Sequence, residues 1–177
     1  MLEGSGIHLR SLLDYPDFPD IMEDGNSFLE NALKKARVVS ERTGEAVLAD
    51  DSGLEVDALG GAPGIYSARY AGEDGNDEKN IRKLLNDMKD IAPKKRGATF
   101  RCVLVLYSAD GRYETFEGRL KGRIAVKPVG RGGFGYDPVF FLPEEGVTVA
   151  QLSTEVKNRI SHRAQAIAKL KERFQKS

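Results

Sequence analysis

A chain of 177 residues with 40% hydrophobic and 31% charged residues has the composition of a globular domain that can bury a core without disulfide bonds. Basic and acidic residues both number 27, so the formal net charge is zero, which argues against a general binder of nucleic acid polymers but not against a local basic pocket for a small anion. A single cysteine, Cys102, and no segment near the roughly 20 apolar residues of a membrane span favour a cytoplasmic protein without an intrachain disulfide.

The first elements in chain order are a strand and a helix. Ile7–Leu13 favours a short strand, and two prolines after it mark a turn. Asn26–Thr43 has the periodicity of a helix, with Asn26 as a suitable N-cap and apolar residues recurring on one face. Gly44 supplies the stop signal for this helix.

A buried strand is predicted at Ala46–Ala49, and it meets two adjacent carboxylates, Asp50 and Asp51. Two like charges side by side repel each other, and carboxylates at the edge of a core need water, a cation or hydrogen-bond donors nearby. We therefore expect the strand to end at these acids. Because ligand sites in α/β sheets gather at the carboxyl ends of strands, this position favours a functional role for the pair.

The rest of the chain alternates helices with strands. Asn76–Lys89 is predicted to be a helix, and Thr99–Ser108 and Phe116–Ile124 are predicted to be strands joined as a hairpin by an Ala-Asp-Gly turn. A glycine-rich loop then leads into a short apolar strand, and a helix at about Ser161–Gln175 closes the chain. This mixture of hairpin strands, isolated strands and helices predicts the α/β class with a mixed sheet.

Four acidic residues form the first group of candidate functional residues, namely Glu23, Asp24, Asp50 and Asp51. A Mg²⁺ site commonly uses one or two carboxylates together with waters and substrate phosphates. A second carboxylate nearby can accept a proton from an attacking water. The alternative for Glu23 and Asp24 is that they only complement the dipole of the helix that comes after them.

The second group is the glycine-rich segment Gly130–Pro138, with the sequence GRGGFGYDP. Its glycines allow backbone N–H groups to approach an anion or a flat ring closely, and Phe134 or Tyr136 can stack on a nucleobase. No Gly-Lys-Ser/Thr sequence comes after it, so the segment is not a Walker loop. A tight hairpin turn is the alternative interpretation.

The third group lies in KNRISHRAQA, Lys157–Ala166. Ser161 as the N-cap of the last helix puts His162 and Arg163 in its first turn, where cations oppose the helix dipole. A local rule broken in this way is typical of a ligand site. The alternative is that Arg163 pairs with a surface acid and His162 is exposed. Taken singly, the lysines, among them Lys35, are typical of a solvated surface.

Four segments resemble the successive motifs of one enzyme family, and they are GNSFLENALKKA, LADDSGLEVDALGGAPGIYSARYAG, GGFGYDPVFF and KNRISHRAQA. The family is that of the non-standard purine nucleoside triphosphate pyrophosphatases, also called inosine triphosphatases, Ham1-like proteins or dITP/XTP pyrophosphatases. The resemblance implies one domain over residues 1–177, with an elongated mixed central sheet flanked by helices, two lobes and a central cleft. It also implies a homodimer. The implied reaction is Mg²⁺-dependent hydrolysis of a phosphoanhydride bond, which converts ITP, dITP and XTP to the monophosphate and pyrophosphate and cleans the nucleotide pool.

The resemblance also implies roles for single residues. Asp51 resembles the family's catalytic acid and metal ligand, with Asp50 as a second catalytic residue and Glu23 as a second metal ligand. The loop from Phe134 resembles the one that grips the nucleoside, with Phe134 under the base. The implied substrate-binding residues are Ser52, Phe134, Gly135, Tyr136, Asp137, Lys157, His162 and Arg163, of which the last three resemble the residues that read the purine edge.

The chemistry of the bases agrees with this assignment. Hypoxanthine and xanthine carry a carbonyl where adenine carries an amine, and the side chains of Lys157 and Arg163 are donors only. In adenine the 6-amino group, a hydrogen-bond donor, would therefore face the donor groups of Lys157 and Arg163. Neither group would have an acceptor, and an unpaired buried polar group costs about 1–3 kcal/mol. Guanine shares the carbonyl, so its exclusion has to act at its 2-amino group.

The beginning of the chain departs from the family pattern. Members of the family open with a strand and a short Thr/Ser-x-Asn-x-x-Lys loop that holds the triphosphate, whereas the residues after Met1 resemble the segment downstream of that loop and its helix. The missing segment can reflect a shortened chain, a misassigned start codon or a natural short form. In each case we expect this chain to be less stable, and to hydrolyse ITP more slowly, than a version extended upstream. The alternative function is a nucleotide-binding protein without turnover, which would bind IMP but release no pyrophosphate from ITP or XTP.

Overall fold

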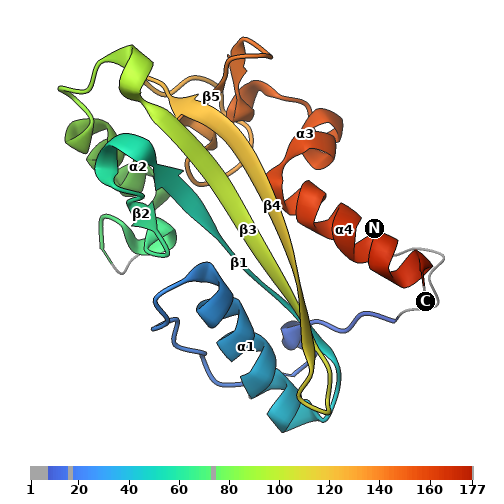
Figure 1. Ribbon diagram of the computed structural model, residues 1–177. Coiled ribbons are helices and arrows are strands. Elements are labelled where there is room, and N and C mark those ends of the chain that lie inside the picture. Colours follow the sequence, from blue (N-terminus) through green and yellow to red (C-terminus); the bar gives the residue numbers. More distant parts are fainter. Residues whose placement is uncertain (1–7, 16–17, 73–74, 177) are drawn as a thin grey trace.

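The computed structural model describes residues 8–15, 18–72 and 75–176. Its centre is a twisted, elongated sheet with the strand order β2-β1-β3-β4-β5-β6 (Figure 1). The strands are β1 Val47–Val56, β2 Pro63–Gly64, β3 Gly97–Tyr107, β4 Tyr113–Ile124, β5 Phe140–Leu142 and β6 Val147–Thr148. The helices are α1 Phe28–Thr43, α2 Asp77–Asp87, α3 Thr154–Ile160 and α4 His162–Gln175.

The α/β class with a long central sheet flanked by helices is confirmed. The expectation of a mixed sheet is wrong, because every described strand pair is antiparallel. The reason lies in the connection between β1 and β3, which contains β2 and α2. This connection leaves the sheet after Val56 and re-enters it at the start of β3, where Ala98 pairs with Val56. Strand β3 therefore runs antiparallel to β1.

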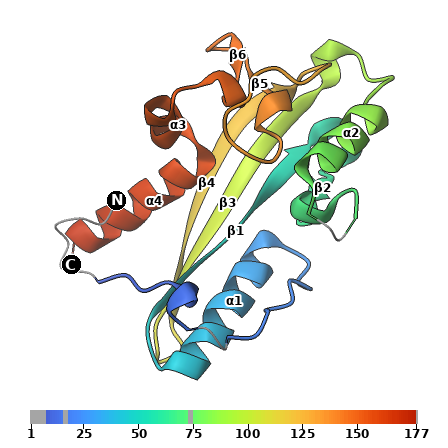
Figure 2. The same cartoon turned by 180° about the vertical axis from the view of Figure 1, so that it is seen from behind.

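Helices α1 and α4 cover opposite faces of the three long strands. Ala32 and Ala36 of α1 pack against Val105 of β3, whereas Ala166 and Leu170 of α4 belong to a cluster around the buried Cys102. Successive strand residues point to opposite faces, so residues of odd and even number on β3 meet different helices. Both views of the ribbon place α1 near one end of the strands and α2 with β2 near the other, which gives the two lobes (Figure 2).

Local signals define the ends of α1. Ser27 is the N-cap, and its side chain accepts a hydrogen bond of 3.1 Å from the backbone N–H of Glu30. The predicted cap Asn26 therefore lies one residue too early. Gly44 ends the helix in the left-handed region with φ of 71°, as expected from the sequence. The predicted second helix, the hairpin through the Ala-Asp-Gly turn and the last helix are also confirmed.

Two predicted segments differ from the structure. Ile7 lies outside the described residues, and the residues after it form no strand up to Leu13 but contain a 3₁₀ turn at Leu12–Asp14, capped by Ser11. Strand β1 does not end at Ala49, because it continues to Val56 through both carboxylates. None of the helices within the described residues is long and apolar enough to cross a membrane.

Helix α4 lies directly against β4 because β4 has a glycine at the crossing point. A β-carbon on Gly118 would overlap the carbonyl oxygen of His162 and lie 2.8 Å from the backbone nitrogen of Ala166. The absence of a side chain at Gly118 thus sets the distance between the sheet and the first turn of α4. That turn carries two of the predicted site residues, His162 and Arg163.

Candidate functional site

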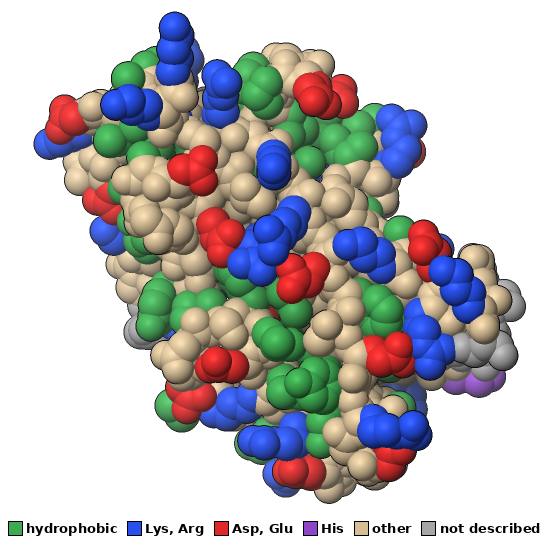
Figure 3. All heavy atoms as spheres, in the orientation of Figure 1, with side chains coloured by type: hydrophobic (Ala, Val, Ile, Leu, Met, Phe, Trp, Pro, Cys, Tyr) green, Lys and Arg blue, Asp and Glu red, His purple; other side chains and the backbone are tan. Residues whose placement is uncertain are grey.

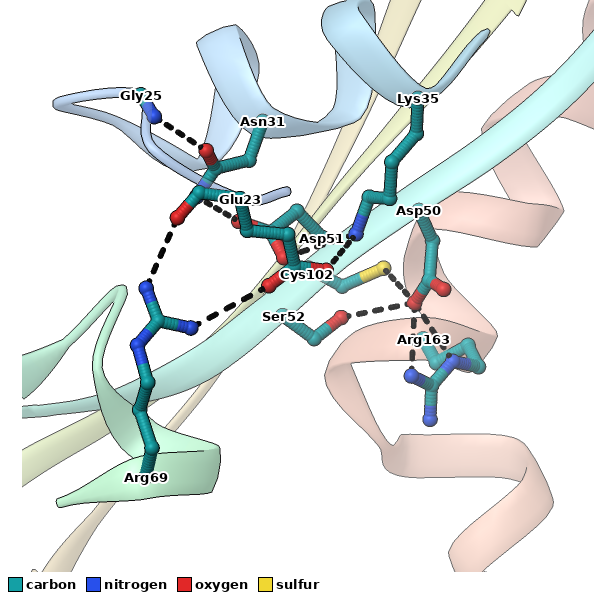
Figure 4. A network of polar contacts seen from close by, with 10 residues as sticks. All are labelled: Glu23, Gly25, Asn31, Lys35, Asp50, Asp51, Ser52, Arg69, Cys102 and Arg163. Atoms are coloured by element: carbon teal, nitrogen blue, oxygen red, sulfur yellow. Dashed lines mark hydrogen bonds and ion pairs between the residues drawn. The ribbon is translucent and has the colours of Figure 1, made fainter. Parts of the chain in front are cut away.

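The adjacent acids Asp50 and Asp51 face opposite sides of the sheet. They occupy neighbouring positions in the middle of β1, where side chains alternate between the faces. Asp51 meets Asn31 and Lys35 of α1, and Asp50 meets Arg163 of α4 (Figure 4). The repulsion that the sequence suggested is relieved because each carboxylate has its own cationic partner on its own face.

On the α1 side, Lys35 joins two carboxylates. Its Nζ lies 2.8 Å from Glu23 Oε1 and 3.1 Å from Asp51 Oδ1, and the amide of Asn31 donates a hydrogen bond of 3.2 Å to Asp51 Oδ2. Asp51 is only 6% exposed, and burial raises its pKa, although Lys35 opposes that shift. Burial alone would lower the pKa of Lys35, but the bond to Glu23 and the charge of Asp51 outweigh it and raise that pKa.

Glu23 is held by the loop after β2 as well as by Lys35. Arg69 donates a hydrogen bond of 2.9 Å to the backbone carbonyl of Glu23, and its other terminal nitrogen lies 3.9 Å from the Glu23 carboxylate. Asp24, by contrast, forms an exposed ion pair of 2.6 Å with Lys34. The structure therefore brings Glu23 and Asp51 together and leaves Asp24 on the surface, where charged side chains of both signs are interspersed (Figure 3).

On the α4 side, the hydrogen bonds that Asp50 accepts from the described residues meet on one oxygen. Arg163 donates to Asp50 Oδ2 from Nε at 3.1 Å and from Nη2 at 2.7 Å, and the Ser52 hydroxyl donates to the same oxygen at 3.0 Å. The thiol of Cys102 lies 3.9 Å from it. Burial favours the neutral form of Asp50, but Arg163 outweighs it and lowers the pKa of this carboxyl.

A cavity of about 510 Å³ lies between β1, the glycine-rich loop and the α3–α4 turn. All eight substrate-binding residues predicted from the sequence line it, namely Ser52, Phe134, Gly135, Tyr136, Asp137, Lys157, His162 and Arg163. Further lining residues include Ser67, Asp77, Phe100 and Asn158. The cavity adjoins the acids, because Ser52 comes directly after Asp51 on β1.

The glycine-rich loop is fastened at both of its sides. Asp137 forms an ion pair with Lys157 and accepts a hydrogen bond of 3.0 Å from the backbone N–H of Phe134. Asp77 at the start of α2 accepts one of 2.6 Å from Gly135 N–H. The ammonium of Lys157 lies 4.4 Å from the ring centroid of Phe134, whose side chain is 62% exposed. A lysine and an exposed aromatic face are thus held together at the cavity.

His162 is buried beneath this cavity and stacks on Phe100 with ring centroids 5.0 Å apart. Burial, together with the charges of Arg163 and Lys157, lowers the pKa of His162 to about 4, so the imidazole is neutral at pH 7. Its Nδ1 is buried and has no hydrogen-bond partner among the described residues. The alternative of an exposed His162 is thereby excluded, and the acid that pairs with Arg163 is Asp50, whose side chain is 37% exposed.

The carboxylates on the α1 side fit a divalent cation. Oxygens of Glu23 and Asp51 converge on the single cationic nitrogen of Lys35, so two hard oxygen donors already surround one positive charge. No cluster of three or more acidic, histidine or cysteine side chains with metal-binding geometry occurs among the described residues. Mg²⁺ does not need such a cluster, because one or two carboxylates with substrate phosphates suffice.

Lys35 and Asn31 are site residues that the sequence did not lead us to expect. The helical spacing of Phe28, Asn31, Lys35 and Val39 puts the two polar residues on the apolar stripe of α1. A lysine and an asparagine on a buried stripe need buried partners, and this signal could have identified them. The expectation that Lys35 belongs to a solvated surface is wrong, as its side chain is 22% exposed and doubly paired.

Comparisons with known proteins agree on one family. The model of the Ham1 family matches residues 1–173. A dITP/XTP pyrophosphatase of Geobacter sulfurreducens is 53% identical over 172 residues, which cover 97% of this chain and 86% of that protein. Another, of Geobacillus kaustophilus, is 52% identical over 96% of this chain and 83% of its own length. The solved structure of the Staphylococcus aureus Ham1 protein superposes with a TM-score of 0.87 at 46% identity, covering 93% of this chain and 84% of that one.

Proposed function

The chain belongs to the Ham1 family, and on that premise we propose that it is a nucleoside triphosphate pyrophosphatase acting on ITP, dITP and XTP. The products are the nucleoside monophosphate and pyrophosphate. The observation that carries the proposal is a cavity of about 510 Å³ beside paired carboxylates: an aromatic face and cationic donors line the cavity, and Glu23 and Asp51 converge on Lys35 near it. One domain over residues 1–177 contains both parts.

The base end of the substrate belongs in the cavity. Phe134 offers an exposed ring for stacking, and Lys157 beside it is a donor for the carbonyl of hypoxanthine or xanthine. Adenine would turn an amine toward Lys157, which leaves two donors facing each other. Stacking therefore supplies affinity for any purine, and Lys157 supplies the discrimination against adenine.

The triphosphate belongs at the carboxylates of the α1 side. Mg²⁺ held by Glu23 and Asp51 would neutralise charge on the phosphate oxygens. Asp51 accepts the proton of the water whose oxygen forms a bond to the α-phosphorus, and the bond from that phosphorus to the bridging oxygen breaks as pyrophosphate leaves. Asn31 and Lys35 keep the Asp51 carboxylate in place through their hydrogen bonds.

The two ends of the site adjoin on β1. Within the described residues, β2 pairs only with Leu54 and Glu55, so the β1 edge beside Asp51 and Ser52 carries no further strand. The cavity on the α4 side and the Asp51 carboxylate on the α1 side lie on opposite faces of β1, and Ser52, which lines the cavity, is the residue next to Asp51.

The family resemblance also leads us to propose a homodimer and a cytoplasmic site of action. The sole cysteine is a buried free thiol, which suits a reducing compartment. Sedimentation analysis of the purified chain tests the dimer, because a homodimer has twice the mass of 19.5 kDa calculated from the sequence.

Pyrophosphate release tests the proposed function. We expect release from ITP, dITP and XTP with Mg²⁺, and much slower release from ATP. Asp51→Asn should lower kcat by about 10²–10⁴-fold, the usual contribution of a general base, while leaving IMP affinity nearly unchanged. Binding of IMP without any release from the unmodified chain would contradict the proposal and favour a nucleotide-binding protein.

A further inference from the structure

Asp50 is tied to two residues of the cavity by its side-chain hydrogen bonds. Its Oδ2 accepts two hydrogen bonds from Arg163 and one from Ser52, and both of these residues line the cavity. Figure 4 shows Asp50 turned toward Arg163 and Asp51 turned toward Lys35. The two carboxylates thus diverge although their residues are adjacent.

The position of Arg163 in the fold explains why its guanidinium needs a carboxylate partner. It lies in the first turn of α4, where the helix dipole repels a positive charge, and its long side chain is 40% exposed. Without a fixed acceptor the guanidinium would be free to turn into solvent through several rotatable bonds. Two donors on one carboxylate oxygen keep the Nε and Nη2 edge of the guanidinium turned toward Asp50.

We propose that Asp50 is a positioning residue, which holds the Arg163 guanidinium at the wall of the base cavity and takes no part in activating water. The inference rests on the proposed function in that the cavity is taken to bind a purine. The two adjacent acids then have different roles. Asp50 acts through Arg163 on nucleoside affinity, and Asp51, with Glu23, acts at the phosphates.

The division is a consequence of strand geometry. A second catalytic carboxylate would have to reach the same water as Asp51, yet neighbouring side chains of an extended strand point to opposite faces. Asp50 Oδ2 is moreover surrounded by donors from Arg163, Ser52 and Cys102, which stabilise the carboxylate and make it a poor proton acceptor.

Binding of IMP, which involves no chemistry, tests the inference directly. Asp50→Ala should weaken IMP binding in calorimetry by about 10- to 100-fold, the usual effect of losing hydrogen bonds to a charged group. The same variant should raise KM for dITP by a similar factor with kcat changed less than about threefold. Asp50→Asn keeps an oxygen acceptor and should restore part of the affinity. Asp51→Asn should show the opposite pattern, with kcat lost and IMP affinity kept.

A double-mutant cycle tests whether Asp50 acts through Arg163. If it does, Asp50→Ala combined with Arg163→Ala binds IMP no more weakly than Arg163→Ala alone. Arg163→Lys, which cannot present two parallel donors, tests the same link should Asp50→Ala fail to fold. Glu114→Ala is the matched control, because it removes an ion pair of 2.7 Å between β4 and Arg173 of α4 away from the cavity, and it should leave IMP binding unchanged.

The opposite results would overturn the inference. They are additive losses of IMP affinity in the cycle, or a kcat loss in Asp50→Ala as large as that in Asp51→Asn. Absence of IMP binding to the unmodified chain would overturn it as well, since the cavity would then not be a base site. Failure of the proposed function alone looks different: the unmodified chain would bind IMP and release no pyrophosphate, and the cycle would still report on Asp50 and Arg163.

Discussion

The ammonium of Lys35 lies 3.1 Å from an oxygen of Asp51, so a fixed positive charge already stands beside the carboxylate proposed to bind Mg²⁺. The same ammonium pairs with Glu23. A charge in this place compensates the acids when no metal is bound and keeps them close together. Lys35 therefore holds the two carboxylates together electrostatically.

Removal of this charge should make the fold depend on a divalent cation. In Lys35→Met the carboxylates of Glu23 and Asp51 lose their shared partner, and we expect a loss of about 1–3 kcal/mol in the free energy of unfolding without metal. Added Mg²⁺ should raise the Tm of this variant more than that of the unmodified protein, because binding to the folded state stabilises it. Thermal denaturation with Mg²⁺ and with EDTA measures both effects. Lys34→Met, which breaks only the exposed pair with Asp24, should change little; equal behaviour of the two variants would refute the role of Lys35.

Selectivity among purines should depend on Lys157. Lys157→Met removes the donor while keeping the length of the side chain, so we expect the ratio of kcat/KM for dITP to that for dATP to fall about tenfold, in line with one unpaired polar group. Parallel assays with the two triphosphates give this ratio. Lys171→Met, on the exposed side of α4, serves as the control. An unchanged ratio in Lys157→Met would mean that a group other than Lys157 distinguishes the 6-carbonyl of hypoxanthine from the 6-amine of adenine.

Stability should fall in mild acid because His162 is buried as the neutral imidazole. Its pKa is lowered to about 4 in the folded protein, from 6.5, by burial and by Arg163 and Lys157, with Asp50 opposing. The unfolded chain therefore takes up this proton first, and the contribution of His162 to stability is intact above about pH 6.5 and is lost as the pH falls to about 4. The loss is about 3 kcal/mol at most.

The variant His162→Gln isolates this effect from the other titrating groups. Urea denaturation at pH 7 and pH 4.5 should show a smaller loss of stability in His162→Gln than in the unmodified protein. Equal losses in the two proteins would show that His162 is accessible to protons in the folded state.

Gly118→Ala should disturb the base site from outside it. The added β-carbon would collide with the carbonyl oxygen of His162, so α4 has to move away from β4. We expect a loss of stability of about 1–3 kcal/mol, as for other overpacked positions, and weaker IMP binding than in the unmodified protein. Glu117→Ala, at the neighbouring position on β4, should leave IMP binding unaffected. Tight IMP binding to a folded Gly118→Ala protein would show that α4 tolerates the shift.

The sequence predicts most elements because their signals are local. The periodicity of α1, the Gly44 stop and the turn of the β3–β4 hairpin each depend on a few neighbouring residues. The sequence does not predict helix α3, because seven residues are too few to establish a helical period, although Ser153 caps it.

The extent of β1 could not be read from the sequence for a different reason. Two adjacent carboxylates look like the end of a buried strand unless their partners are known, and these partners come from Lys35 on α1 and from Arg163, 113 residues away along the chain. Residue chemistry alone pointed to Phe134, Tyr136, His162 and Arg163 as candidates, whereas the full set of eight predicted cavity residues came from the resemblance of their motifs to a family. Their types alone left a hairpin turn and a solvated surface as open alternatives.

The alternation of β1 also makes the site sensitive to chain length. A strand has a period of two, so deleting or inserting one residue between Val47 and Asp50 would turn each acid to the face that the other now serves. Lys35 would then meet a different carboxylate, and Arg163 would lose the one that orients it. Substitutions in this segment change one side chain at a time, whereas a change of a single residue in length would move both acids to the wrong face at once.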